Sequence, residues 1–210
     1  MPPPDPSSGW DAIADRFAAL RSEIGSDVVR RWAAQLPPGG SVVDIGCGTG
    51  WPVARILADA GLAVSGIDPS PTLLAAFRRT LPDAPAACEP VQTSGFFART
   101  FDGAVAIGVL FLLSEADQRT AIARIATVLR PGGRLLFSAP RTPCRWHDTL
   151  TGRLSVSLGE AGYRALLADA GMTLVDMAAD AGGNDYFDAI VDPTCRQVEP
   201  STCRVSDRSA

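Results

Sequence analysis

Lysine is absent from the 210 residues, histidine occurs once, and the five cysteines include no Cys-x-x-Cys pair. Without lysine the chain has neither a Schiff-base catalyst nor a phosphate loop of the Gly-Lys-Ser/Thr type. A single histidine, His147, excludes sites built from several imidazoles, including zinc hydrolases with an HExxH helix. An odd number of widely spaced cysteines favours reduced thiols in a cytoplasmic protein over a disulfide framework, and we expect no metal site.

Long hydrophobic runs and an excess of positive charge are also missing. The longest apolar stretch, residues 103–113, is about half the length that crosses a bilayer, and the formal net charge is −4. We therefore expect a soluble protein with neither a membrane nor a nucleic-acid partner. With 46% hydrophobic residues the length suits one domain, at residues 10–192, between a flexible Pro/Ser-rich leader (1–9) and a polar tail (193–210).

Strand and helix patterns alternate along this domain. Helical periodicity marks residues 10–21, 26–36, 52–60, 71–80 and 115–129, and a possible capping box of Ser157 and Glu160 opens another helix that runs to residue 170. Short apolar runs predict strands at 41–45, 63–67, 86–88, 103–107, 134–138, 172–177 and 186–191. This order predicts a single α/β domain with a mostly parallel seven-stranded sheet, helices on both faces and an N-terminal helical cap.

The first strand leads into a glycine-rich turn at Gly46, Gly48 and Gly50. Positions without a Cβ let backbone amides approach a ligand closely, and Asp68, at the end of the second strand, suits the two hydroxyls of a ribose. A dehydrogenase fingerprint would need a small residue where the chain has Trp51. Asp44, just before the turn, is better placed for an ammonium group than for a pyrophosphate. A ribose end and a cationic amino-acid end together describe S-adenosylmethionine.

Four motifs in series resemble those of the class I S-adenosylmethionine-dependent methyltransferases: VVDIGCGTG (42–50), SGIDPSP (65–71), FDGAVAIGVLFLL (101–113) and LRPGGRLLFS (129–138). The resemblance implies a Rossmann-like fold, with S-adenosylmethionine as cofactor and S-adenosylhomocysteine as product. It implies Asp44 near the methionine ammonium, Gly46, Cys47, Gly48 and Gly50 along the methionine portion, Asp68 on the ribose, Pro69 and Ser70 beside the adenosine, Glu89 and Gln92 as candidates for the adenine amino group, and Gly108 beneath the methionine arm.

The acceptor side is less clearly marked. His147 is a candidate general base with Asp148 to orient it, because both follow the fifth strand; a loop histidine without catalytic duty is the alternative. Many members of the family carry a histidine after the fourth strand, where this chain has Phe111 and Leu112. Candidate contacts of the acceptor are Phe111, Trp146, Tyr163, Asn184 and Tyr186. Packing in the core is the favoured alternative for Trp146 and Tyr163, and a turn asparagine and a strand tyrosine explain Asn184 and Tyr186 equally well. We expect Trp10, Phe17 and Arg21 to form either a lid over the methionine end or an ordinary hydrophobic helix face.

We therefore predict in-line methyl transfer to a hydrophobic small molecule by a monomer or homodimer. Two alternatives remain open on the sequence alone. One is a non-catalytic module that binds the cofactor or its product as a sensor or partner subunit. The other is a different nucleoside-dependent enzyme on the same fold, such as an aminopropyl transferase or a dehydrogenase.

Overall fold

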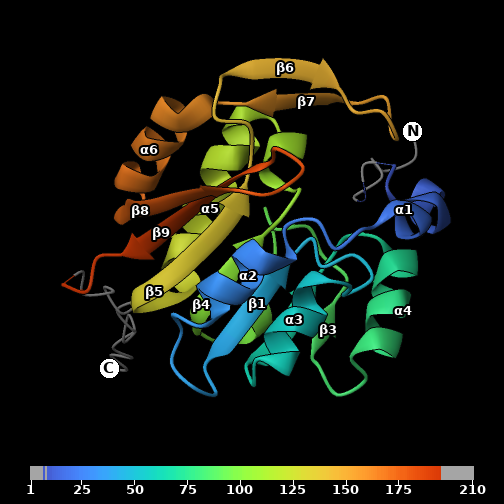
Figure 1. Ribbon diagram of the computed structural model, residues 1–210, viewed down its shortest axis with the longest axis horizontal. Coiled ribbons are helices and arrows are strands. Elements are labelled where there is room, and N and C mark those ends of the chain that lie inside the picture. The colour runs from blue at the N-terminus through green and yellow to red at the C-terminus, as the bar shows by residue number, and fades with distance from the viewer. Residues whose placement is uncertain (1–6, 8, 195–210) are drawn as a thin grey trace, which may run out of the picture.

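The structure of the protein is a computed structural model that describes residues 7 and 9–194 (Figure 1). The predicted leader and polar tail lie almost wholly outside the described residues. None of the described helices is long and apolar enough to cross a membrane.

A seven-stranded sheet forms the centre of the domain, in the order β3-β2-β1-β4-β5-β9-β8. β1 (Ser41–Ile45), β2 (Ala63–Ile67), β3 (Ala86–Ala87), β4 (Phe101–Ala106) and β5 (Leu129–Ser138) run parallel to one another. β8 (Met172–Ala179) and β9 (Asp185–Val191) form an antiparallel pair, and β9 is antiparallel to β5. The predicted sheet is confirmed, and its inner strands are apolar because both of its faces are covered.

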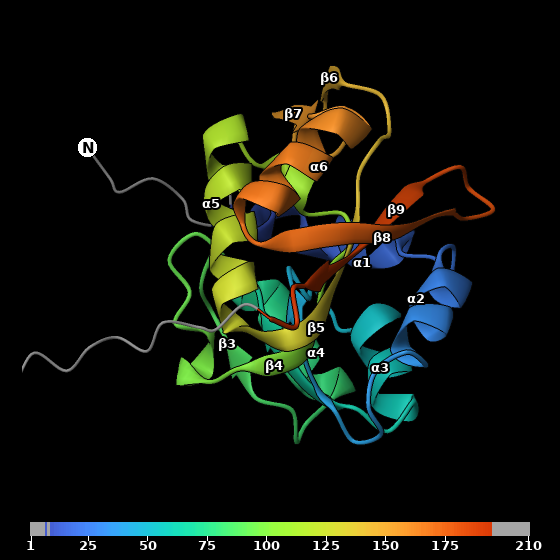
Figure 2. The same ribbon diagram turned by 90° about the vertical axis from the view of Figure 1, so that its left-hand side faces the viewer.

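Helices cover the two faces of the sheet (Figure 2). On one face α2 (Ser26–Ala33), α3 (Val53–Asp59) and α4 (Pro71–Thr80) enclose a core that contains Trp32, Leu57 and Phe77. On the other face α5 (Glu115–Val128) and α6 (Gly159–Asp169) enclose a second core around Ile122 and Phe137. These two apolar layers fix the strands rigidly, so the residues at the strand ends are held in defined positions.

Two predictions on the segment after β5 are wrong. Instead of a loop, the chain forms a hairpin of β6 (Cys144–His147) and β7 (Leu154–Ser157). The capping box is not formed, because the Ser157 hydroxyl accepts from the Gly159 amide and donates to the Pro140 carbonyl. Glu160 pairs instead with Arg141 and Arg164.

The N-terminal segment continues over the end of the sheet. A 3-10 turn, η1 (Asp11–Ile13), leads into α1 (Ala14–Leu20) beside the start of α4, as Figure 1 shows. Asp11 Oδ1 accepts hydrogen bonds from Ser70 Oγ at 2.6 Å and from the Thr72 amide at 2.9 Å. α2 then packs on α3, whereas η1 packs on α4.

Candidate active site

A cavity of about 300 Å³ lies at the carboxyl ends of β1, β2 and β4. We call it the glycine-turn cavity. Most residues that the sequence predicts to bind a cofactor line this cavity: Trp10, Phe17, Arg21, Gly46, Cys47, Gly48, Asp68, Pro69, Glu89, Gln92 and Gly108. Asp44, Gly50 and Ser70 do not line it: Asp44 is buried in β1, Gly50 packs on Phe77, and Ser70 begins α4 as its N-cap.

The turn after β1 requires glycine for its backbone conformation and because neighbouring side chains lie where a Cβ would be. Gly46 has φ +65°, and a Cβ built on it would lie 2.4 Å from Val109 Cγ2. A Cβ on Gly48 would lie 3.2 Å from the ring of Phe17. The backbone of the turn therefore lies against Val109 at Gly46 and against Phe17 at Gly48. A residue with a side chain at either position would crowd these neighbours.

Asp68 is held at the floor of the cavity by two backbone donors. Its Oδ1 accepts from the Ser70 amide at 2.8 Å, and its Oδ2 accepts from the Gly48 amide at 2.9 Å. Burial raises the pKa of Asp68, while these two hydrogen bonds act in the opposite direction. Each carboxylate oxygen retains a second acceptor position, so the oriented group can bind two neighbouring hydroxyls.

Asp44 is a buried acidic residue, and one of its carboxyl oxygens lacks a hydrogen-bond partner among the described residues. Its side chain is 3% exposed, and the oxygen without a partner is Oδ2. Burial raises the pKa of Asp44 to about 8, although the Arg21 guanidinium favours the charged form. A cationic group placed close to Asp44 would favour its carboxylate form.

Aromatic side chains of the N-terminal segment form one wall of the glycine-turn cavity. Trp10 and Phe17 pack edge to face with ring centroids 5.3 Å apart, and the Arg21 guanidinium lies 5.3 Å from the Phe17 centroid. Arg21 Nε also donates to the Trp51 carbonyl at 3.3 Å. The predicted lid residues therefore form one packed group at the cavity and not merely a hydrophobic helix face.

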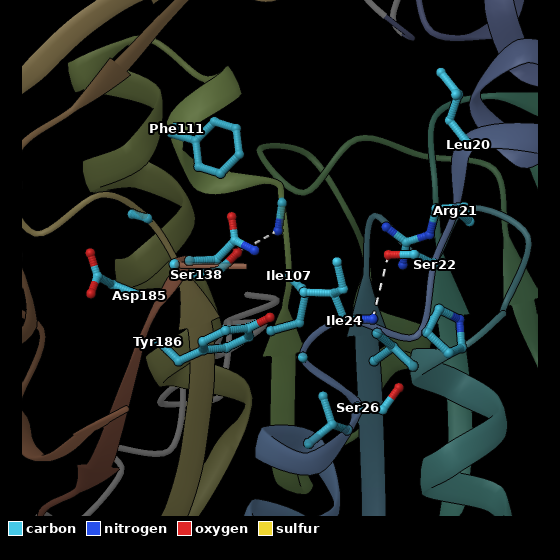
Figure 3. Close-up of a pocket in the computed structure, with 18 of the residues that line it drawn as sticks. Leu20, Arg21, Ser22, Ile24, Ser26, Ile107, Phe111, Ser138, Asp185 and Tyr186 are labelled. Carbon is cyan, nitrogen blue, oxygen red and sulfur yellow. Dashed lines mark hydrogen bonds between the residues drawn. The ribbon is translucent and has the colours of Figure 1, made fainter. Parts of the chain in front are cut away.

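A second cavity, of about 480 Å³, adjoins the first. We call it the adjoining cavity. It shares with the glycine-turn cavity the residues Phe17, Arg21, Ile107, Gly108 and Phe111. Figure 3 shows that Phe111 and Tyr186 approach it from the side opposite Arg21 and Leu20. The two cavities therefore lie side by side at the residues that they share.

The turn between β8 and β9 contributes the polar end of the adjoining cavity. The Tyr186 hydroxyl donates to Asp180 Oδ2 at 2.9 Å, and the Asn184 side-chain amide donates to the same oxygen at 2.9 Å. Burial, together with the hydrogen bond to Asp180, raises the pKa of Tyr186. Both Asn184 and Tyr186 line the cavity, as do Phe111 and Trp146 among the predicted acceptor contacts.

Tyr163 does not reach either cavity, contrary to the sequence prediction. It is fully buried in the core beside α5, where its hydroxyl donates to Gln118 Oε1 at 3.0 Å. Its ring packs edge to face on Phe137 and Phe187. Tyr163 is therefore a core residue, which its place among apolar residues on a helix could not distinguish from a ligand contact.

His147 and Asp148 do not form the predicted pair. His147 is exposed on β6 and lines neither of the two cavities. Asp148 lines the glycine-turn cavity, but its Oδ1 accepts from the amides of Leu150 and Thr151 and from the Thr151 hydroxyl. Asp148 thus fixes the turn of the hairpin instead of orienting an imidazole.

Some residues that line the cavities were not predicted from the sequence. Ser138, at the end of β5, lines the adjoining cavity, and its Oγ accepts from the Gly108 amide at 2.8 Å. Its place at the carboxyl end of a parallel strand beside Gly108 could have identified it. The loop from Leu20 to Ser26 also lines this cavity, and no local pattern in the sequence points to that position.

Comparisons with known proteins agree with this arrangement. Residues 42–133 match the model of a methyltransferase domain. The chain is 34% identical over 144 residues to aklanonic acid methyltransferase DauC of Streptomyces sp. (strain C5), covering 64% of each chain. It is 31% identical over 128 residues to a tRNA U34 carboxymethyltransferase of Hahella chejuensis, covering 58% of this chain and 39% of that one. The chain spans about half the length of the curated relatives that it matches.

Solved structures share the fold. A Burkholderia thailandensis 1,6-didemethyltoxoflavin-N1-methyltransferase, solved with 1,6-didemethyltoxoflavin and S-adenosylhomocysteine bound, matches with a TM-score of 0.67 at 24% identity. The match covers 91% of this chain and 92% of that chain.

Proposed function

We propose that this chain is a class I S-adenosylmethionine-dependent methyltransferase, which its match to a methyltransferase-domain model over residues 42–133 supports, and that it transfers a methyl group from S-adenosylmethionine to a hydrophobic small molecule. S-adenosylhomocysteine would be released. The observation that carries the proposal is the junction of the two cavities at Ile107, Gly108 and Phe111, where a cofactor and an acceptor can meet. In-line displacement requires this alignment of two bound molecules and the exclusion of water.

The polar groups at the glycine-turn cavity suit S-adenosylmethionine. Asp68 would accept from the two ribose hydroxyls, while the amides of the glycine turn and the buried carboxyl group of Asp44, which a cation would ionise, suit an amino-acid end. Apolar side chains of Ile67, Leu73 and Val91 line the same cavity as Glu89 and Gln92 and would contact a base there. When bound, the cofactor would supply a methyl group on a positively charged sulfonium.

The chain's own residues would then orient and shield the reactants. Trp10 and Phe17 close one wall of the glycine-turn cavity against water, and Phe111 packs against Trp146 with ring centroids 5.3 Å apart at the adjoining cavity. Ser138 and Tyr186 supply hydroxyl oxygens in the adjoining cavity, where they can position a polar group of the acceptor. Transfer would depend mainly on positioning, since methyl transfer needs no covalent bond to the enzyme.

The lining of the adjoining cavity supports an apolar acceptor. Apolar side chains such as Leu20, Ile24, Val29, Ile56 and Phe111 line part of it, beside polar side chains that include Ser138, Asn184 and Tyr186. Two similar proteins are named for aklanonic acid and 1,6-didemethyltoxoflavin, and one for tRNA. The net charge of −4 favours a small molecule over a nucleic acid. We propose a cytoplasmic monomer or homodimer.

Isothermal titration with S-adenosylmethionine tests the proposal directly. The wild type should bind in the micromolar range or tighter, and Asp68→Ala should weaken binding about 100-fold, because two hydrogen bonds to a charged group are lost. Asp59→Ala is the matched control, since Asp59 is exposed on α3 and pairs only with Arg55 among the described residues. A folded, ligand-free wild type that binds nothing would overturn the proposal.

Turnover separates the enzyme from a binding module. A panel of hydrophobic phenols, enols and amines is incubated with cofactor and protein, and S-adenosylhomocysteine is measured. Product formation that Asp68→Ala abolishes supports methyl transfer. Tight binding without turnover of any acceptor would favour a sensor or a partner subunit instead.

A further inference from the structure

The segment between β3 and β4 lines one end of the glycine-turn cavity and has an unusual backbone. Glu89, Val91 and Gln92 face the cavity. A few residues later, Phe96, Phe97 and Ala98 have φ values of 45°, 57° and 51°, in the left-handed region that residues with a side chain avoid. Such a conformation costs roughly 1–2 kcal/mol per residue, so other contacts must hold the segment in place.

Ser94 connects the strained turn to Glu89. It is completely buried, and its hydroxyl donates to Glu89 Oε1 at 2.5 Å. The Ser94 hydroxyl oxygen also accepts from the Phe96 amide at 2.9 Å. An amide N–H can only donate and an ionised carboxylate can only accept, so the hydroxyl oxygen accepts from Phe96 and the single hydroxyl proton is directed at Glu89.

Arg124 of α5 also holds this segment in place. Its guanidinium donates to the Ser94 carbonyl and, through Nε, to the Val91 carbonyl at 3.3 Å. The guanidinium carbon also lies 5.8 Å from the centroid of the buried Phe96 ring. The helix therefore holds Ser94 and Val91 relative to the sheet, and through Ser94 it determines the position of the Glu89 carboxylate.

We infer that Ser94 is a positioning residue that presents Glu89 to the cavity as a hydrogen-bond acceptor, and so selects a nucleobase with an amino group at that edge. The inference rests on the proposed function. With Oε1 occupied by the Ser94 proton, Oε2 remains to accept from the ligand. An exocyclic amine such as that of adenine satisfies it, whereas the 6-oxo group of hypoxanthine would place two acceptors against each other.

Binding of two product analogues tests the inference without measuring activity. S-adenosylhomocysteine and its hypoxanthine counterpart, S-inosylhomocysteine, are titrated into the wild type and Ser94→Ala. We expect the wild type to prefer the adenine compound by about 100-fold, and Ser94→Ala to reduce that preference about 10-fold. The ratio isolates positioning, because a general loss of structure weakens both ligands equally.

Ser65→Ala is the matched control. Ser65 is also fully buried and hydrogen-bonded, in its case to Arg99, but it does not line the glycine-turn cavity. It should leave the preference unchanged even where it lowers the melting temperature. A preference in Ser94→Ala equal to that of Ser65→Ala and the wild type would overturn the inference.

Glu89→Gln provides a second measurement if Ser94→Ala fails to fold. Its side-chain oxygen can still accept from Ser94, which turns the amide N–H groups towards the ligand. The preference should then shift towards S-inosylhomocysteine, and an unchanged ratio would again refute the role of Ser94. If the wild type binds neither compound, the proposed function fails as well, which distinguishes that failure from an error about Ser94 alone.

Discussion

Asp44→Asn should stabilise the free protein at neutral pH while it weakens cofactor binding. Asp44 lies in the middle of the sheet, where it pairs with Gly66 of β2 and Val105 of β4. Its carboxyl group is buried and has one oxygen without a partner within the described residues. Asparagine has nearly the same shape and carries no charge, so the substitution removes the ionisation and little else.

The magnitude follows from the pKa of Asp44, which burial raises from 3.8 to about 8. Between these two pH values the folded protein retains a proton that the unfolded chain has lost. The favourable contribution of the neutral carboxyl is complete below pH 3.8 and is lost as the pH rises towards 8, by about 1.4 kcal/mol per pH unit. From pH 5 to pH 8 the stability advantage of Asp44→Asn should therefore grow by about 4 kcal/mol.

Urea unfolding at pH 5, 6, 7 and 8 measures this difference. Subtracting the wild type from the variant removes the contributions of other acids, including Asp68 and Asp188, whose pKa values burial also raises. Asp59→Asn serves as a surface control and should show no such slope. If the difference between Asp44→Asn and wild type is the same at all four pH values, the reasoning about burial is refuted.

The same ionisation should appear in cofactor binding. A ligand ammonium near Asp44 favours the carboxylate, so binding below pH 8 should release a proton, and affinity should fall up to tenfold per pH unit as the pH is lowered. Titration in buffers with different ionisation enthalpies measures the released proton. Asp44→Asn should bind more weakly and release none, which would show that this acid reduces stability in exchange for binding.

Two further substitutions test other parts of the site. Gly25→Ala would place a Cβ 2.0 Å from Tyr186 Oη at φ +87°, whereas Gly183→Ala, at φ +77°, meets nothing within 4 Å. Gly183→Ala should therefore cost about 1 kcal/mol in denaturant unfolding and Gly25→Ala about 2 kcal/mol more; equal losses would contradict the crowding of Gly25 against Tyr186. His147→Ala should change cofactor affinity and turnover less than about twofold, because His147 is exposed outside both cavities. A 100-fold loss of turnover with normal binding would restore it as the general base.

The fold could be predicted because its signals are local. Residues 41–45, 63–67 and 71–80 were predicted with the same bounds that the structure gives to β1, β2 and α4. An apolar strand, a glycine turn and an N-cap serine each depend on neighbouring residues only. The hairpin of β6 and β7 carries no such signal, because most residues of β6 are exposed and its pairing depends on contacts that the local sequence does not encode.

The residues of the candidate site likewise include some that the sequence could predict and some that it could not. Gly46, Gly48 and Asp68 follow strand ends, so their approach to one cavity follows from the sheet itself. Tyr163 and Tyr186 could not be distinguished by type or local pattern, yet one lies in the core and the other lines a cavity. Ser94 could not be predicted from the sequence. Its role depends on its hydrogen bond to Glu89 and on the hydrogen bond that its carbonyl accepts from Arg124 of α5.

Ser70 connects the N-terminal segment to Asp68 at the glycine-turn cavity. Its hydroxyl donates to Asp11 at 2.6 Å, and its amide donates to Asp68 at 2.8 Å. Asp11 and Asp68 thus hold the start of α4 from two sides. Since Phe17 of the same segment contacts the glycine turn at Gly48, a ligand bound between Asp68 and Phe17 favours the docked segment. By thermodynamic reciprocity, docking of this segment must then strengthen binding of that ligand.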